Sequence, residues 1–364
     1  MTASVNVRPP DVAPINVALV GYGYAGRVFH APLIRATPGL HLHTVVSSRP
    51  EAVHADLPDV RVVADVEAVI ADRSLGLMVI ATPNDLHAPL TRRAIEADMA
   101  VVVDKPFTVT LDEARALQTL SEDKGGFITV FHNRAWDADF LTIQQLIREQ
   151  RLGRITRFES HFSRFRPQVR DRWRERPGPG AGIWYDLGPH LVDQALRVMG
   201  RPVALTADIA AVRPGGGADD WFHVTMRFQD DSRAILHADM TSTSDLRFVV
   251  ESETGGFVKH GLDPQEDALK AGIVPGSPGW GVDPRPGVLT TVDGEGRRTQ
   301  EIVQGPPGDY LALYRGVRDV WSDFSPSIPE HMRPVPLYRA VEVMEVIEAG
   351  LVSARERREV ILED

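Results

Sequence analysis

The stretch Val17-Ala18-Leu19-Val20-Gly21-Tyr22-Gly23-Tyr24-Ala25-Gly26 decides how the first third of this chain folds. An apolar run that starts at residue 15 predicts a buried strand, and glycines with the spacing G-x-G-x-x-G follow it directly. A helical pattern then continues to about residue 35. Such glycines allow a tight turn, a close approach of the backbone to a pyrophosphate, and close packing of helix on strand. The spacing alone is a weak signal, but its place between a strand and a helix favours a dinucleotide-binding turn over a plain connection.

The next hundred residues continue the alternation of apolar runs with helical patterns. The apolar runs cover residues 42–47, 61–63, 77–81, 101–103 and 127–131, and helical patterns cover residues 85–97 and 112–124. Near-continuous Val, Ile and Leu runs of this kind are typical of parallel strands that are buried on both faces. The sequence therefore predicts a doubly wound α/β sheet, a Rossmann domain, over residues 1–133.

The pattern changes after a further predicted helix at about residues 137–149. Residues 155–165, 222–228 and 234–240 alternate between apolar and polar side chains, and a polar turn, residues 229–232, joins the last two runs. Apolar residues from 337 to 351 recur at helical spacing, while residues 177–182 and 272–287 are rich in Gly and Pro and predict loops. We expect an α+β domain with an open, mainly antiparallel sheet over residues 134–364, with the boundary near residues 132–137.

The composition disfavours several classes of function. The chain has 364 residues and a formal charge of −10, which disfavours attraction to nucleic acid or to anionic membranes. The absence of cysteine excludes disulfides, thiolate zinc sites and cysteine nucleophiles. Residues 1–14 read as a frayed tail without the apolar core of a signal peptide, and no run approaches the roughly 20 apolar residues that span a bilayer. We therefore expect a cytoplasmic protein.

The residues after the second predicted strand bear on the choice of cofactor. An acidic residue there would bind the ribose 2′-hydroxyl of NAD, whereas arginine suits the 2′-phosphate of NADP. This chain has Ser47, Ser48 and Arg49 at that place, and Glu51 lies beyond a proline. The sequence thus favours NADP over NAD.

Two further motifs carry groups suited to proton transfer. Lys105 follows the fifth predicted strand, at the sheet edge where ligands bind in open α/β sheets. Asp186 and His190 stand four residues apart in Trp184-Tyr185-Asp186-Leu187-Gly188-Pro189-His190, where Gly188 and Pro189 predict the start of a helix. Alternatively, Asp186 is an N-cap, His190 a buried structural histidine, or the two are metal ligands. No third ligand stands in register, so we expect no metal.

A segment rich in arginine, residues 164–176, leaves its role open. Its six arginines, with Trp173 among them, suit a solvated loop, the rim of a substrate site that binds sugar hydroxyls or a carboxylate, or, less well at this net charge, nucleic acid. Arg166 and Trp173 are the substrate-binding candidates that we take from this segment.

The three motifs together resemble the glucose–fructose oxidoreductase/inositol dehydrogenase (Gfo/Idh/MocA) family. The resemblance rests on the glycine motif, on Asp104-Lys105-Pro106, where the family usually has Glu, and on the Asp186 to His190 spacing. Further stretches look like the subgroup of NADP-dependent scyllo-inositol dehydrogenase: Phe29-His30-Ala31-Pro32, Thr82-Pro83-Asn84, Phe131-His132-Asn133-Arg134 and Ile183-Trp184-Tyr185-Asp186. The resemblance to the family covers essentially the whole chain.

This resemblance implies an NAD(P)-dependent dehydrogenase or reductase acting on a secondary alcohol of a cyclitol, sugar or related polyol. It implies that Lys105 binds the reacting hydroxyl, that His190 is the general acid/base, and that Asp186 assists it. It implies a homodimer or homotetramer that associates through the sheet face. The alternatives are a non-sugar carbonyl or dihydrodiol as substrate, or a non-catalytic NADP-sensing regulator. Further residues that it assigns to the cofactor or the substrate are Thr82, Pro83, Asn84, His87, Asp104 and Tyr185.

Overall fold

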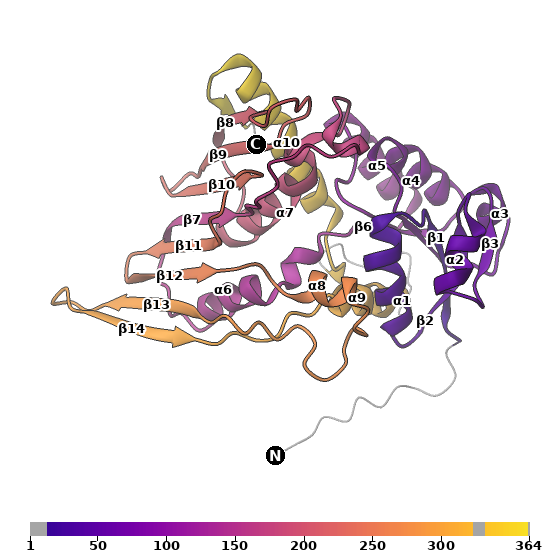
Figure 1. Cartoon of the computed structure of the whole chain (residues 1–364), viewed down its shortest axis with the longest axis horizontal. Coiled ribbons are helices and arrows are strands. Elements are labelled where there is room, and N and C mark those ends of the chain that lie inside the picture. The colour runs from indigo at the N-terminus through magenta and orange to yellow at the C-terminus, as the bar shows by residue number, and fades with distance from the viewer. Residues whose placement is uncertain (1–12, 323–331, 363–364) are drawn as a thin grey trace.

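The computed structural model describes residues 13–322 and 332–362. The predicted N-terminal tail lies almost wholly outside these residues. Within them, two sheets lie side by side, each covered by helices (Figure 1).

The first sheet has six parallel strands in the order β3-β2-β1-β4-β5-β6. Their bounds are β1 Ile15–Val20, β2 Leu40–Val46, β3 Arg61–Val63, β4 Leu77–Ile80, β5 Ala100–Val103 and β6 Ile128–Val130. The strand order reverses between β1 and β4, and ligands bind beyond the carboxyl ends of strands at such a reversal. The predicted doubly wound α/β sheet is therefore confirmed.

Helices connect these strands and cover the sheet. They are α1 Ala31–Ala36, which continues a π-helical turn at Gly26–His30, α2 Pro50–Asp56, α3 Glu67–Ile70, α4 His87–Glu96 and α5 Leu111–Lys124. A capping box starts α5, because the Thr110 hydroxyl accepts from the Glu113 amide while the Glu113 carboxylate accepts from the Thr110 amide. The same carboxylate accepts from the Val109 amide, so the loop after β5, which carries Lys105, has a fixed end.

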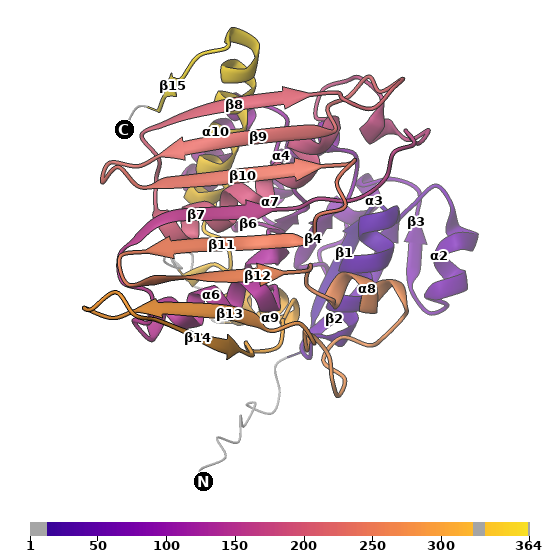
Figure 2. The same cartoon turned by 60° about the vertical axis from the view of Figure 1, so that its left-hand side comes forward.

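The second sheet has nine strands in the order β14-β13-β12-β11-β7-β10-β9-β8-β15 (Figure 2). Their bounds are β7 Ile155–His161, β8 Ala204–Ala210, β9 Trp221–Arg227, β10 Arg233–Asp239, β11 Leu246–Ser252, β12 Gly255–His260, β13 Gly287–Val292, β14 Arg298–Val303 and β15 Val360–Ile361. The neighbouring strands pair antiparallel except for β7 and β10, which pair parallel. The predicted mainly antiparallel sheet is confirmed.

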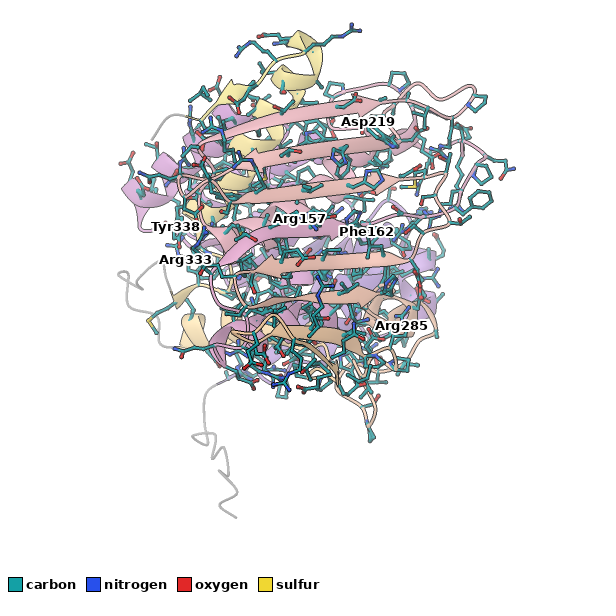
Figure 3. The ribbon with its side chains drawn as sticks, turned by 90° about the vertical axis from the view of Figure 1, so that its left-hand side faces the viewer. Arg157, Phe162, Asp219, Arg285, Arg333 and Tyr338 are labelled. Atoms are coloured by element: carbon teal, nitrogen blue, oxygen red, sulfur yellow. The ribbon has the colours of Figure 1, made fainter. Side chains whose placement is uncertain are left out.

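Helices cover one face of this second sheet. The helices after β6 are α6 Ala138–Arg148, α7 Gly182–Met199, α8 Gln265–Lys270, α9 Leu311–Ser322 and α10 Leu337–Glu356. Both α7 and α10 pack on the nine-stranded sheet, and α10 also contacts α5 and β6. One cluster of buried apolar side chains therefore runs from Val101 in β5 through Leu191 in α7 to Val343 in α10. The other face of the sheet has no helix over it in the described residues (Figures 2 and 3).

The start of α7 differs from the prediction. The helix begins at Gly182, so Pro189 lies inside it and Asp186 is not an N-cap. The cap comes from another segment, because the Asp219 carboxylate accepts from the Trp184 amide at 2.7 Å. Gly188 is required for packing, since a Cβ there would lie 2.7 Å from Cε3 of Trp184.

Candidate active site

The predicted catalytic set consists of Lys105, Asp186 and His190, which lie on segments that belong to two different sheets. Lys105 lies two residues after β5, whereas Asp186 and His190 lie on α7. The Lys105 Nζ donates to the Asp186 Oδ1 at 2.8 Å and to the Asp186 main-chain oxygen at 2.6 Å. The side chains of Lys105 and Asp186 are only 13% and 22% exposed. A partly buried ion pair thus joins the end of the parallel sheet to the helix that covers the second sheet.

Asp186 is held as a carboxylate by the cations around it. Burial by itself raises the pKa of Asp186, but Lys105, Arg174 and Arg164 more than offset this and bring the pKa well below its usual range. The Arg174 Nε lies 3.4 Å from the same Oδ1 atom. Asp186 therefore stays negative, and its role towards Lys105 is electrostatic.

His190 lies one helical turn beyond Asp186 and is buried. Its Nδ1 has no hydrogen-bond partner among the described residues, and no hydrogen bond joins it to Asp186 in that part of the chain. Burial first, and then Lys105, Arg134 and His132, lower the pKa of His190 well below its ordinary value. The assistance of Asp186 to His190 that the resemblance implied stays a prediction; the contact that Asp186 makes in the structure is with Lys105.

His132 is a neighbour of His190 that the sequence reasoning did not single out. The two rings lie 6.4 Å apart and nearly perpendicular. Both nitrogens of His132 are buried without a partner among the described residues, and burial lowers its pKa to about 4. Its position two residues after β6, at the carboxyl edge of the sheet, was the signal that could have identified it.

The glycine turn fits a dinucleotide. Gly21 has φ +98°, and a Cβ there would lie 2.5 Å from the Ala81 oxygen. A Cβ on Gly26 would lie 2.2 Å from the Gly21 oxygen, whereas one on Gly23 would meet no atom within 4 Å. The open space at Gly23 is what a pyrophosphate needs to approach the backbone. The first helical hydrogen bond runs from the Arg27 amide to the Gly23 oxygen, so the amides between them can donate to a phosphate.

The tyrosine side chains of this turn have other partners. Tyr22 is buried, and its hydroxyl donates to the carboxylate of Asp56, the last residue of α2. Tyr24 is exposed, and its hydroxyl donates to Glu266 of α8 at 3.1 Å. We therefore expect Tyr22, Tyr24 and Ala25 to contribute their main chain to a cofactor site. The side chain of Tyr24 links the glycine turn to α8.

The residues after β2 are placed as an adenosine site requires. Ser47 follows the strand directly, and its hydroxyl accepts from the Arg49 amide at 3.1 Å. Ser48 and Arg49 are exposed, and the Arg49 guanidinium has no hydrogen-bond or ion-pair partner within the described residues. An unpaired guanidinium beside two hydroxyls suits a phosphate monoester.

The loop after β4 holds two buried polar atoms that have no hydrogen-bond partner among the described residues. They are the Thr82 Oγ1 and the Asn84 Oδ1. The Asn84 amide donates to the Gly180 oxygen, which orients its free oxygen, and Pro83 between them is exposed. Free hydrogen-bonding atoms at the end of β4 suit a polar ligand such as a nicotinamide ribose.

Other predicted side chains have structural partners. The two ring nitrogens of His87 lie 2.7 Å from the Pro106 oxygen and 3.1 Å from the Thr82 oxygen, so His87 ties two loops together. The Asp104 carboxylate accepts from the Lys105 amide, which fixes the turn. The Tyr185 hydroxyl donates to the Val109 oxygen, and burial raises the pKa of Tyr185 to about 12. We infer that these residues position the site.

Four charged residues that the prediction left out surround the set. The Arg134 guanidinium is buried and donates to Glu266 at 2.7 Å, while Arg164 lies 3.6 Å from the same carboxylate. Arg174 stacks on the ring of Trp173, with 4.5 Å between its Cζ and the ring centroid. The arginine-rich segment was visible in the sequence, but Glu266 of α8 had no local signal.

The described residues contain neither a cluster suited to a metal ion nor a helix suited to span a membrane. No cluster of three or more His, Asp or Glu side chains between residues 13 and 322 or 332 and 362 is arranged to hold a metal ion. No helix in those ranges combines the length and apolar character needed to cross a membrane.

Two family models match this chain, in agreement with its two sheets. One, described as an oxidoreductase family with an NAD-binding Rossmann fold, matches residues 15–132. The other, described as a GFO/IDH/MocA C-terminal domain, matches residues 140–258.

Similar proteins cover nearly the whole length. The uncharacterized oxidoreductase YdgJ of Escherichia coli is 48% identical over 94% of this chain and 97% of its own. The NADP(+)-dependent scyllo-inositol 2-dehydrogenase IolW of Bacillus subtilis is 36% identical over 97% of each chain. Among solved structures, an oxidoreductase of Yersinia pestis has a TM-score of 0.89 at 44% identity, over 97% of this chain and 98% of that one.

Proposed function

Because this chain belongs to the Gfo/Idh/MocA family of NAD(P)-dependent oxidoreductases, we propose that it transfers a hydride between NADP and a secondary alcohol of a cyclitol, sugar or related polyol. The observation that carries this proposal is the 2.8 Å contact of the Lys105 Nζ with the Asp186 Oδ1, one helical turn from His190. The relatedness to IolW, whose name states scyllo-inositol and NADP(+), supports the substrate class and the cofactor.

The proposed roles follow from the charges of these groups. An alcohol that loses a hydride must also lose its hydroxyl proton. Lys105 donates a hydrogen bond to the alcohol oxygen and stabilises the negative charge that develops there. His190 is neutral, because burial lowers its pKa, and so it accepts the hydroxyl proton; in the reverse direction the imidazolium returns it. Asp186 keeps Lys105 in place through two hydrogen bonds.

NADP, when bound, supplies or accepts the hydride. We propose that the amides of the glycine turn hold its pyrophosphate, and that Ser47, Ser48 and Arg49 hold the 2′-phosphate. Thr82 and Asn84 have the free buried oxygens that suit its nicotinamide ribose.

Substitution of the catalytic set tests this proposal. In Lys105→Met and His190→Asn we expect kcat/KM with a polyol such as scyllo-inositol to fall by about 10²- to 10³-fold, the loss typical of an electrostatic or proton-transfer group. The dissociation constant for NADP, measured by fluorescence titration, should change less than twofold. Lys124→Met, at the exposed end of α5, is the matched control. Undiminished turnover in both active-site variants would show that the chemistry takes place elsewhere.

We also propose that the uncovered face of the nine-stranded sheet binds a second copy of the chain, giving a homodimer or homotetramer. The half-buried apolar residues Trp221, Ile235 and Val249 lie on β9, β10 and β11 of this sheet. Ile235→Asp should halve the particle mass measured by light scattering. An unchanged mass, or a monomeric parent protein, would contradict this assembly.

A further inference from the structure

The arginine segment, residues 164–176, is fixed in place rather than loose. It extends β7, because the Arg164 amide donates to the Asp239 oxygen at 2.8 Å and the Arg166 amide to the Met240 oxygen at 2.7 Å. The buried guanidinium of Arg213 then donates to the main-chain oxygens of Arg166 and Gln168 at 2.9 and 3.1 Å. The backbone that carries Arg166 is thus held at both its amide and its carbonyl group.

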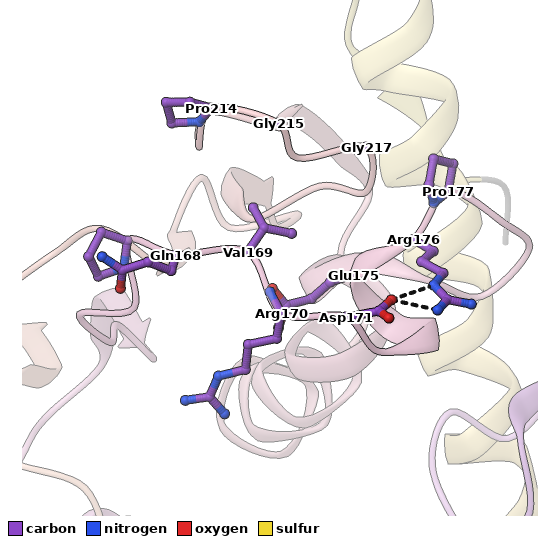
Figure 4. A pocket seen from close by; sticks show the side chains of 11 residues that line it. Gln168, Val169, Arg170, Asp171, Glu175, Arg176, Pro177, Pro214, Gly215 and Gly217 are labelled. Carbon is purple, nitrogen blue, oxygen red and sulfur yellow. Dashed lines mark hydrogen bonds and ion pairs between the residues drawn. The ribbon is translucent and has the colours of Figure 1, made fainter.

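Two arginines of the segment, Arg172 and Arg176, form ion pairs with carboxylates of the same segment. Arg176 contacts the Asp171 carboxylate, and this pair borders a surface hollow of about 820 Å³ that also includes Pro214, Gly215 and Gly217 (Figure 4). Arg172 contacts Glu175 at 2.6 Å. Each of these two guanidinium groups already has a carboxylate partner, so neither calls for a ligand.

On the side next to the predicted catalytic set, the arginines have no carboxylate of their own. Arg164 lies 3.6 Å from Glu266 and Arg174 lies 3.4 Å from Asp186, distances too long for good hydrogen bonds. Both carboxylates are already bound, Glu266 by Arg134 at 2.7 Å and Asp186 by Lys105 at 2.8 Å. Guanidinium groups therefore outnumber the carboxylates available to them.

Arg166 is the clearest case. Within residues 13–322 and 332–362 its guanidinium makes no hydrogen bond or ion pair, and its side chain is only partly exposed. Burial first, and then Arg164, Arg170 and Arg172, lower the pKa of Arg166. Like charges held together in a partly buried place are costly unless an anion joins them. This local excess of positive charge is found in a chain whose overall charge is −10, so it is not a consequence of the overall composition.

We propose that the polyol substrate carries an anionic group, a carboxylate or a phosphate, which Arg166 binds together with its neighbour Arg164. This inference rests on the proposed function and narrows its substrate class. Guanidinium groups bind carboxylate and phosphate through paired hydrogen bonds, and such contacts orient as well as attract. Arg164 and Arg166 stand two residues apart on the extension of β7 and so face the same side, and Arg164 is close enough to Asp186 to lower its pKa. An anion bound by the two arginines would therefore lie on the side of the sheet edge that carries Lys105 and Asp186.

Matched neutral and anionic substrates test this inference. With NADP we would compare kcat/KM for glucose, galactose and scyllo-inositol against glucuronate, galacturonate and glucose 6-phosphate, whose two kinds of anion separate carboxylate from phosphate. We expect at least one anionic compound to exceed its neutral parent about tenfold or more. Arg166→Ala should raise KM for that compound by about 10- to 100-fold more than it raises KM for its neutral parent, the value of a charge-assisted hydrogen bond. Arg176→Ala, which loses a paired arginine of the same segment, is the control.

Other outcomes separate the two proposals. Turnover of neutral polyols that equals or exceeds that of the anionic ones, in wild type and in Arg166→Ala alike, overturns this inference and leaves the proposed function standing. Turnover of no compound contradicts the proposed function. The intrinsic tryptophan fluorescence of the protein, titrated with glucuronate and with glucose, then decides the inference, which fails if glucuronate binds no tighter. A weaker affinity for NADP in Arg166→Ala would assign Arg166 to a cofactor phosphate and would also overturn it.

Discussion

The buried histidine His30 should make this protein lose stability in acid. Its side chain is fully buried, and its Nδ1 lies 2.6 Å from the Tyr314 hydroxyl. Burial lowers its pKa from 6.5 to about 4, although Asp104 opposes the shift. The unfolded chain therefore binds a proton near pH 6.5, and the folded chain binds it only near pH 4. Because the unfolded state holds more protons in this window, stability falls as the pH falls from about 6.5 to about 4.

The size of this effect follows from the shift. At about 1.4 kcal/mol for each pKa unit, a shift of about 2.5 units corresponds to roughly 3 kcal/mol. This is a large share of the roughly 5–15 kcal/mol by which most domains are stable. Buried carboxylates act in the opposite sense, since burial raises the pKa of Asp137 to about 7 and that of Asp219 to about 6. The total pH dependence therefore does not isolate His30, but the difference from a variant does.

The assay is urea unfolding, followed by circular dichroism, of wild type and His30→Gln at pH values from 7.5 to 4.5. The stability difference between the two proteins should shift in favour of the variant by about 1.4 kcal/mol for each pH unit below 6.5. His41→Gln, at an exposed histidine of β2, gives the background effect of removing an imidazole. A difference between wild type and His30→Gln that does not vary with pH would refute the reasoning, because His30 would then titrate alike in both states.

Three further predictions concern the site and its support. Arg49→Ala should raise KM for NADP at least tenfold and KM for NAD less than twofold, measured by the absorbance of the reduced cofactor; equal effects would contradict the phosphate assignment. Gly188→Ala should lower the urea-unfolding free energy by about 1–3 kcal/mol, because its Cβ would lie 2.7 Å from Trp184, whereas no loss would mean that the ring shifts freely. Alcohol oxidation should keep its rate below pH 6.5, since His190 has a lowered pKa, and a fall that begins above pH 6.5 would contradict this.

The sequence was most informative where strands are buried on both faces. The strands β1 and β4 to β6 read as short apolar runs, because a parallel sheet covered on both sides has no polar face. The strands β8 and β11 to β15, and the helices α2, α3, α8 and α9, were not predicted. The strand β14 shows the reason: its residues Arg298 to Glu301 are exposed at an edge, so pairing with β13 rather than burial makes it a strand.

The site was predictable in its residues but not in its contacts. Spacing identified Asp186 and His190, and position after a strand identified Lys105. Four-residue spacing on a helix does not say which of the two meets a lysine 81 residues away. That depends on how α7 lies across the end of β5, which is set by packing such as that of Trp184 against α10. Local sequence does not encode such an arrangement.

Pro189 illustrates how a residue misread in the sequence gains a place in the site. The sequence suggested that it begins the helix, yet α7 is already seven residues long when it reaches Pro189. Proline has no N–H and crowds the carbonyl of the fourth residue before it, here Tyr185, so this turn of the helix lacks a donor. Lys105 supplies a donor at the adjacent carbonyl, that of Asp186, at 2.6 Å. The ammonium of Lys105 is thus held by a main-chain oxygen as well as by a carboxylate. The contact with the main-chain oxygen does not depend on the protonation state of the Asp186 carboxyl group. The two contacts with Asp186 use two of the three N–H groups of the Lys105 ammonium, which leaves one donor for a substrate oxygen.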